Sequence, residues 1–252
     1  MNNQRLQLLM FHHAGGNSSI FSDFAKRCFD DFNVIQLEMP GRGRRRHEPL
    51  MYCVDHVIKD FASQVPPQGD IVLFGYSLGA YIAYVMASYC RKLSPKRKII
   101  LVVISNEPIH CRRKFFLGAG EFTHQQLLKF TTKLGQLPKW LREESTMLQS
   151  FLNVLEADLC VANSISAELS SPLNDIPILV VYGNNDPLLP TPPLRWRECT
   201  QKTFNIIEVS GDHFILSEQE TQIYKIMKDF LNKVAFDRQP SGKSDSDQNN
   251  QR

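Results

Sequence analysis

The sequence lacks a hydrophobic run long enough to cross a membrane. Its longest uninterrupted run of aliphatic Val, Ile and Leu side chains, Ile99–Ile104, has six residues, whereas a membrane-spanning helix needs about 20. The apolar segment nearest the amino terminus, Leu6–Phe11, contains Gln7 and is followed by two histidines. That segment is too short to be the hydrophobic region of a signal peptide, and a first β-strand explains it better.

The six cysteines form no Cys-x-x-Cys pair and no cluster with histidine at zinc spacing. A chain of 252 residues buries a large core without disulfides, so we interpret them as reduced thiols in a cytoplasmic protein. An excess of one charge is also missing, since 29 basic and 26 acidic residues leave a net charge of +3. This balance gives no electrostatic reason to expect a nucleic-acid ligand. The 42% hydrophobic content is that of a globular protein.

Short apolar segments rich in valine and isoleucine alternate with helical patterns along the chain. The expected strands are Leu6–Phe11, Val34–Leu37, Ile71–Phe74, Ile99–Ile104, Ile178–Tyr182 and Phe204–Val209. The expected helices are Ser19–Phe29, Val54–Val65, Leu78–Cys90 and Gln219–Val234. Mostly unalternated apolar strands are typical of parallel sheets covered on both faces. The pattern predicts an α/β fold with a mostly parallel, doubly wound sheet in a single domain of residues 1–236.

Two stretches depart from this alternation. Residues 112–172, approximately, show helical periodicity and no convincing strand, so we expect a helical lid over the carboxyl ends of the strands, where such sheets bind ligands. Ordinary core helices are the alternative, and the two interpretations are compatible because a lid also packs on itself. Residues 237–252 contain no large apolar side chain, and we expect a disordered tail there.

The segment Gly75-Tyr76-Ser77-Leu78-Gly79 directly follows an expected strand and opens an expected helix. Its glycines permit a sharp strand-to-helix turn that exposes the serine hydroxyl at the amino end of the helix. An ordinary helix cap is the alternative interpretation. The strand–turn–helix context favours Ser77 as a nucleophile.

A serine hydroxyl needs a base that takes its proton. In hydrolases with this turn, the acid and then the histidine follow the serine along the chain. Of the seven histidines only His213 lies beyond the last expected strand, and Asp186 follows the fifth. Asp175 precedes that strand, and Asp212 would have to fold back on its neighbour; a turn aspartate is the alternative interpretation of Asp186. We therefore predict a catalytic triad of Ser77, Asp186 and His213.

The remaining expected parts are an oxyanion hole and an acyl-binding surface. The backbone N–H of Leu78 follows the nucleophile, and the N–H of Ala14 lies in the glycine-containing loop after the first strand. We expect both to stabilise the oxyanion, and we interpret His13 as a residue that braces the loop. Within the expected lid we predict substrate contacts from Phe115, Phe116 and Trp140. Nothing in the sequence calls for a metal or a redox cofactor.

The sequence resembles the type II thioesterases, discrete hydrolases that accompany polyketide and nonribosomal peptide synthesis. The motifs that carry the resemblance are His13-Ala14-Gly15-Gly16, Pro40-Gly41-Arg42, Gly75-Tyr76-Ser77-Leu78-Gly79-Ala80, Asp186-Pro187 and Gly211-Asp212-His213-Phe214. The resemblance covers Leu6 to Val234 and implies the α/β-hydrolase fold with a mobile helical lid. It also implies hydrolysis of acyl or aminoacyl thioesters on the phosphopantetheine arm of carrier proteins, to clear stalled or misloaded units. The carrier protein is then the partner and brings the phosphopantetheine, so the enzyme needs no cofactor, and the fold suggests a monomer.

Two residues differ from the family pattern. Tyr76 occupies a position that is usually histidine, and His12 one that is commonly proline. We expect Tyr76 to pack beneath the turn and to tune activity rather than abolish it. The basic run of Arg42 and Arg44–Arg46 is interpreted first as a solvated loop and second as a contact for an acidic carrier protein.

Two other functions remain open at this point. A carboxylesterase or lipase acting on free oxygen esters would use the same triad. A non-catalytic binding protein of this fold would lack a triad member, and none is missing from the sequence.

Overall fold

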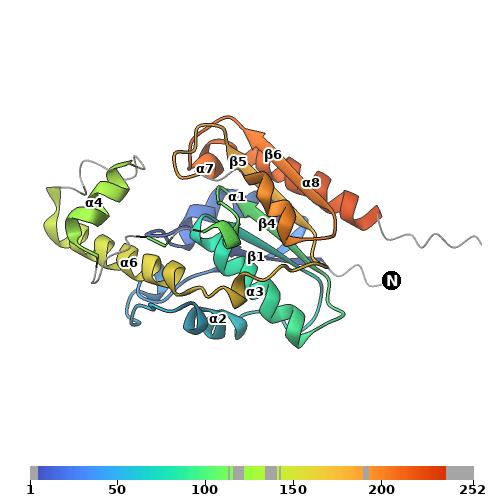
Figure 1. Ribbon diagram of the computed structural model, residues 1–252, viewed down its shortest axis with the longest axis horizontal. Helices are drawn as coiled ribbons and strands as arrows, with labels where there is room; N and C mark the ends of the chain where they lie inside the picture. Colours follow the sequence, from blue (N-terminus) through green and yellow to red (C-terminus); the bar gives the residue numbers. More distant parts are fainter. Residues whose placement is uncertain are drawn as a thin grey trace, which may run out of the picture.

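The computed structural model describes residues 5–112, 114–115, 122–133, 141, 143–189 and 193–236. At its centre lies a six-stranded sheet in the order β2-β1-β3-β4-β5-β6, in which every neighbouring pair is parallel (Figure 1). The strands are β1 (Leu6–Phe11), β2 (Phe32–Leu37), β3 (Ile71–Tyr76), β4 (Ile99–Ile104), β5 (Ile178–Gly183) and β6 (Phe204–Val209). The predicted α/β class with a parallel sheet is confirmed.

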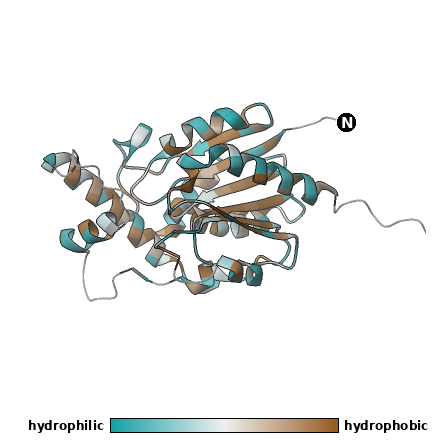
Figure 2. Cartoon of the chain, turned by 90° about the horizontal axis from the view of Figure 1, so that it is seen from above, coloured by the Kyte–Doolittle hydropathy of each residue, from teal (hydrophilic) through white to brown (hydrophobic). Residues whose placement is uncertain are grey.

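Helices cover both faces of this sheet. One face carries α1 (Ser22–Cys28), α7 (Ile215–Glu218) and α8 (Glu220–Phe236), and the other carries α2 (Val54–Ala62) and α3 (Leu78–Leu93). Successive strand residues enter opposite layers: Leu73 and Leu101 pack toward α3, whereas Val72 and Ile100 pack toward α8. Figure 2 shows the hydrophobic strands between helices whose outer sides are hydrophilic. Of the helices in the described ranges, none combines the length and apolarity needed to cross a bilayer.

Short 3₁₀ turns interrupt the connections between these elements. They are η1 (Ser18–Phe21), η2 (Gly43–Arg45), η3 (Ile109–Cys111), η4 (Glu168–Ser170) and η5 (Pro193–Cys199). The predicted helix at Ser19–Phe29 is therefore divided into η1 and α1. In η5 the fully buried Trp196 donates its indole N–H to the backbone oxygen of Asn106 at 2.9 Å. This bond ties η5 to the loop that follows β4.

The connection from β4 to β5 contains α4 (His124–Lys133) and α6 (Ser145–Ser164). Figure 1 shows α4 at one end of the molecule, away from the sheet, while α6 runs back toward α2 and α3. Four leucines are buried between the two helices, Leu127, Leu152, Leu155 and Leu159. Two of the predicted substrate contacts, Phe116 and Trp140, lie outside the described residues, as does the predicted tail at 237–252.

Candidate active site

Ser77 occupies the turn between β3 and α3 with a φ of +52°, a conformation that residues other than glycine seldom adopt. Its backbone is held at both ends: its N–H donates to the oxygen of Ile104 at 2.9 Å, and its oxygen accepts from the Asn106 side chain at 2.6 Å. A Cβ at Gly79 would collide with the backbone oxygen of Phe11. The turn therefore requires glycine where the motif has it.

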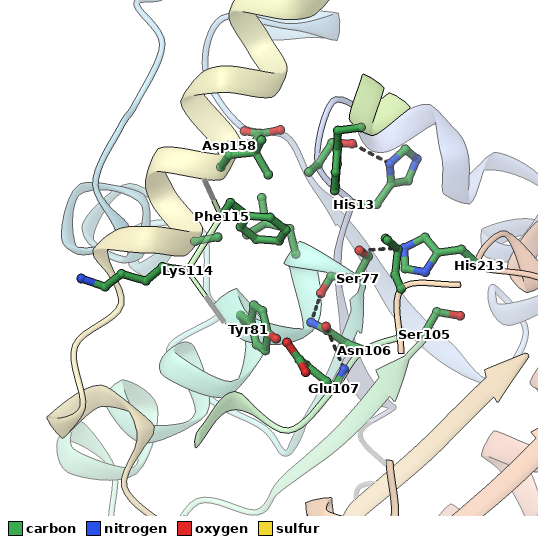
Figure 3. Close-up of a pocket in the computed structure, with 16 residues that line it drawn as sticks. His13, Ser77, Tyr81, Ser105, Asn106, Glu107, Lys114, Phe115, Asp158 and His213 are labelled. Carbon is green, nitrogen blue, oxygen red and sulfur yellow. Dashed lines mark hydrogen bonds between the residues drawn. The ribbon is translucent and has the colours of Figure 1, made fainter. Parts of the chain in front are cut away.

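Ser77, His213 and Asp186 form one hydrogen-bonded chain. The Ser77 Oγ lies 2.9 Å from His213 Nε2 (Figure 3). On the other side of the ring, His213 Nδ1 lies 2.8 Å from Asp186 Oδ2. The other Asp186 oxygen accepts the N–H of Leu188 at 2.8 Å. Both the histidine and the carboxylate are buried. The carboxylate thus favours the tautomer with a proton on Nδ1, which leaves Nε2 free to accept the serine proton.

The turns after β5 and β6 bring the acid to the histidine. The N–H of Asn185 donates to the oxygen of Gly211 at 3.0 Å, and the N–H of Gly211 donates to the Asn184 side chain at 3.2 Å. A Cβ at Gly183 would collide with the backbone oxygen of Asp212. Because the two turns are joined in this way, residues 27 positions apart lie side by side.

Tyr76 contacts His213 through both its ring and its hydroxyl group. Its ring is stacked on His213 with centroids 6.1 Å apart, and its hydroxyl donates to the His213 backbone oxygen at 2.9 Å. Burial raises the pKa of this phenol well above its ordinary value, so it stays a donor. The sequence indicated that Tyr76 packs beneath the turn. The contact with His213 was missed because 137 positions separate the two residues.

The loop after β1 places Ala14 beside Ser77 and Leu78 at the same pocket. Leu78 is the first residue of α3, so its N–H has no partner within the helix. No hydrogen bond within the described chain uses the N–H of Ala14 or Leu78. Nearby, His13 Nδ1 lies 2.9 Å from the oxygen of Ala14. Burial lowers the pKa of His13 to about 4, so its ring is neutral at pH 7 and fits the predicted bracing role.

The pocket above Ser77 has a volume of about 900 Å³, including its open mouth. Its apolar wall consists of Ala14, Leu78, Tyr81, Phe115, Phe130, Leu159, Ala162 and Leu188. Phe115, a predicted substrate contact, meets Phe130 edge to face at 5.6 Å. Tyr81 and Asn106 were not predicted, although the position of Asn106 just after a buried strand was an available signal. The residues described contain no group of three or more His, Cys, Asp or Glu that could hold a metal ion.

The arginine run divides into paired and exposed members. Arg42 is buried and binds Asp158 of α6 through both guanidinium ends, at 2.6 and 2.8 Å. Arg45 binds Asp60 of α2 in the same way, at 2.6 and 2.8 Å. The other two arginines are exposed. The interpretation of the whole run as a solvated loop is wrong for Arg42, which is buried against Asp158, a residue that lines the pocket.

Comparison with known proteins decides the family. The thioesterase domain family matches residues 6–231. The chain belongs to the thioesterase family. It is a hydrolase that acts on thioesters, and the residues that carried the resemblance all lie within the matched range.

This thioesterase is similar to proteins from bacteria and mammals. Thioesterase PikA5 of Streptomyces venezuelae is 26% identical over 91% of this chain and 82% of its own length. The medium-chain S-acyl fatty acid synthase thioesterase of Homo sapiens is 22% identical over 89% of this chain and 85% of its own. The structure of RedJ, a thioesterase from the prodiginine biosynthetic pathway of Streptomyces coelicolor, superposes with a TM-score of 0.73 and 26% identity, covering 85% of each chain.

Proposed function

We propose that this thioesterase removes acyl or aminoacyl groups from the phosphopantetheine arm of carrier proteins, clearing stalled or misloaded units in polyketide or nonribosomal peptide synthesis. The observation that carries the proposal is the chain from Asp186 through His213 to Ser77 at the floor of a largely apolar pocket. Similar proteins support the setting: RedJ comes from the prodiginine pathway and ClbQ, at TM-score 0.78, from the colibactin NRPS/PKS pathway.

In the proposed first step, Ser77 Oγ attacks the thioester carbonyl carbon while His213 Nε2 takes the serine proton. Asp186 stabilises the resulting imidazolium. The C–S bond then breaks, the proton passes from His213 to the departing sulfur, and the acyl group remains on Ser77. By analogy with cysteine, whose thiol has a pKa of about 8.5, the departing phosphopantetheine thiol leaves more readily than an amine would.

In the second step His213 takes a proton from water, whose oxygen attacks the acyl carbon. The bond to Ser77 Oγ breaks, the serine recovers its proton from His213, and a free carboxylic acid departs. In both steps the N–H groups of Ala14 and Leu78 would stabilise the oxyanion. Removal of one such donor typically raises the barrier by about 3 kcal/mol.

The apolar wall suits the acyl group. Phe115, Phe130 of α4 and Leu159 of α6 surround the space above Ser77. Because these residues belong to the β4–β5 connection, we assign α4 and α6 as the lid of the acyl site. A lid of this kind excludes water from the acyl pocket while the chemistry proceeds.

The test is intact-protein mass spectrometry of carrier protein loaded with acetyl, malonyl, hexanoyl or aminoacyl groups. Wild type is expected to remove the acyl mass, and Ser77→Ala is expected to leave it in place. Ser19→Ala changes an exposed serine and serves as the matched control, with wild-type activity. Turnover of small oxygen esters without loss of acyl mass from any carrier would favour a carboxylesterase instead.

A further inference from the structure

Asp158 of α6 forms a buried ion pair with Arg42 and also binds the loop that carries Ala14. Both oxygens of Asp158 accept from the Arg42 guanidinium, at 2.6 and 2.8 Å, and the two side chains are 0% and 4% exposed. Asp158 Oδ2 also accepts the backbone N–H of Gly15 at 2.7 Å. One carboxylate therefore holds both an arginine and the backbone next to Ala14. Figure 3 shows Asp158 on α6 at the edge of the pocket.

The contacted loop is a β-turn from His13 to Gly16, closed by the Gly16 N–H donating to the His13 oxygen at 3.2 Å. Gly15 has a φ of +72°, as the third residue of a type II turn does. The peptide group between Ala14 and Gly15 is held at both ends, because its N–H donates to Asp158 and its oxygen contacts His13 Nδ1 at 2.9 Å. This contact opposes a flip of the central peptide.

The same turn fixes the direction of the Ala14 N–H. That N–H belongs to the peptide group whose oxygen, on His13, accepts from Gly16 and contacts His12 Nδ1 at 2.9 Å. The planar trans peptide aims its N–H opposite to its oxygen. A change in the turn would rotate this peptide and move the Ala14 N–H away from the pocket.

Arg42 compensates the negative charge of the Asp158 carboxylate. An uncompensated carboxylate near Ala14 would oppose the negative charge that develops on the substrate oxygen. Arg42 neutralises Asp158 through two charge-assisted hydrogen bonds and reaches toward the Gly16 oxygen at 3.4 Å. The pair thus braces the turn without a net charge.

We propose that Asp158, neutralised by Arg42, is a positioning residue that holds the Ala14 N–H in the geometry required to stabilise the oxyanion. The proposal rests on the proposed hydrolysis at Ser77. It makes α6 part of the catalytic apparatus, because the helix that roofs the pocket also sets the shape of the oxyanion loop.

The decisive variant is Asp158→Asn, which keeps the volume but replaces one acceptor oxygen with a donor that faces the guanidinium. We expect kcat for an acyl thioester of N-acetylcysteamine to fall about 10- to 100-fold, since small misplacements at a reacting centre have effects of this size. KM should stay within about threefold, because the oxyanion contact forms only in the transition state. The affinity for an alkyl boronic acid, which forms a tetrahedral adduct on Ser77, should fall by a similar factor.

Asp60→Asn is the matched control. It removes one negative charge from a second Arg–Asp pair of the same run, the Arg45–Asp60 pair, which does not line the pocket. Its kcat and boronic acid affinity should equal those of wild type. The melting temperatures of both variants show whether each is folded. If Asp158→Asn does not fold, the double variant Arg42→Gln/Asp158→Asn, which contains no unpaired charge, replaces it.

The proposal is overturned if folded Asp158→Asn keeps wild-type kcat and boronic acid affinity, or if Asp60→Asn loses as much of both. An increase in KM with unchanged kcat would also contradict it. Failure of wild type to act on acyl-carrier proteins, with normal boronic acid binding and thioester turnover, would contradict the carrier function and leave the role of Asp158 standing.

Discussion

At the scale of single residues, Ser77 combines a reactive hydroxyl with a left-handed backbone conformation that L-side chains disfavour. Such strain is worth of order 1–3 kcal/mol and persists only where neighbouring bonds impose it. Here Ile104 and Asn106 provide those bonds to the backbone of Ser77. This backbone conformation directs the hydroxyl toward His213.

A comparison of Ser77→Gly with Ser77→Ala measures that strain. Both variants should lose thioester hydrolysis, because both lack the hydroxyl. Ser77→Gly should have the higher free energy of unfolding, by about 1 kcal/mol, because glycine adopts a positive φ without a steric penalty. Urea denaturation followed by circular dichroism gives this difference. Equal midpoints for the two variants would mean that the turn is not strained.

His13 makes stability depend on pH. Burial lowers its pKa from 6.5 to about 4, so between these values the unfolded chain binds the proton and the folded chain does not. The free energy of unfolding should therefore fall as pH decreases from 6.5 to 4, by up to about 3 kcal/mol from this residue.

His13→Asn provides the check, because its amide can donate to the Ala14 oxygen but does not titrate. The stability profile of this variant, measured by urea denaturation at several pH values, should be flatter than that of wild type below pH 6.5. His12, whose pKa burial lowers to about 3, contributes to the slope that remains. Parallel profiles would show that folding does not lower the pKa of His13.

At the scale of elements, α4 and α6 form a small apolar layer of their own beside the main core. Their buried leucines follow helical spacing and were predictable as a helical insertion. Their relation to the pocket depends on which side chains face Ala14 and Ser77, and spacing alone does not determine this. Phe130 of α4 is such a case, since it lines the pocket although it was not among the predicted substrate contacts.

Phe130→Ala should enlarge the acyl pocket and shift preference toward longer chains. The removed ring lines the pocket and forms the edge-to-face contact with Phe115, so the new space opens within the acyl pocket. The ratio of kcat/KM for decanoyl- to acetyl-loaded carrier protein should rise several-fold. An unchanged ratio would mean that the acyl group of the substrate does not bind beside Phe130. Leu128→Ala, on the same helix and not among the lining residues, is the control.

Physical reasons explain which elements were predictable from sequence. Buried parallel strands such as β4 consist of apolar residues only, and its bounds agree with the predicted segment. β2 begins at Phe32, earlier than predicted, because the edge strand contains the exposed Asn33, which hides the pattern. The chain order of turn motifs indicated Ser77, Asp186 and His213, which the fold brings together.

Contacts made by the tertiary fold alone could not be predicted in this way. The pairing of Arg42 with Asp158 spans 116 positions, and neither residue lies in a local pattern that signals the other. The sequence therefore presented Arg42 as one member of a basic run. Burial separates it from Arg44 and Arg46, which are exposed.

At the scale of the whole molecule, the exposed arginines concern recognition of a partner. Arg45 is committed to Asp60 and Glu48, so only Arg44 and Arg46 can be changed without breaking such an ion pair. The double variant Arg44→Ser/Arg46→Ser should leave KM for acyl-carrier protein unchanged, as expected of a solvated loop. An increased KM for the carrier, with unchanged KM for a small thioester, would instead identify a docking contact.

The strand order has a consequence for how activity is lost. His213 follows β6, which lies at the edge of the described sheet with one neighbouring strand, whereas Ser77 follows the central β3. Edge elements open before the core does. Inactivation should therefore precede unfolding: in rising urea, hydrolysis should disappear at a lower urea concentration than the far-ultraviolet circular dichroism signal of the whole fold. The urea concentration at which the enzyme stops working is then set by the opening of β6, not by the stability of the whole fold.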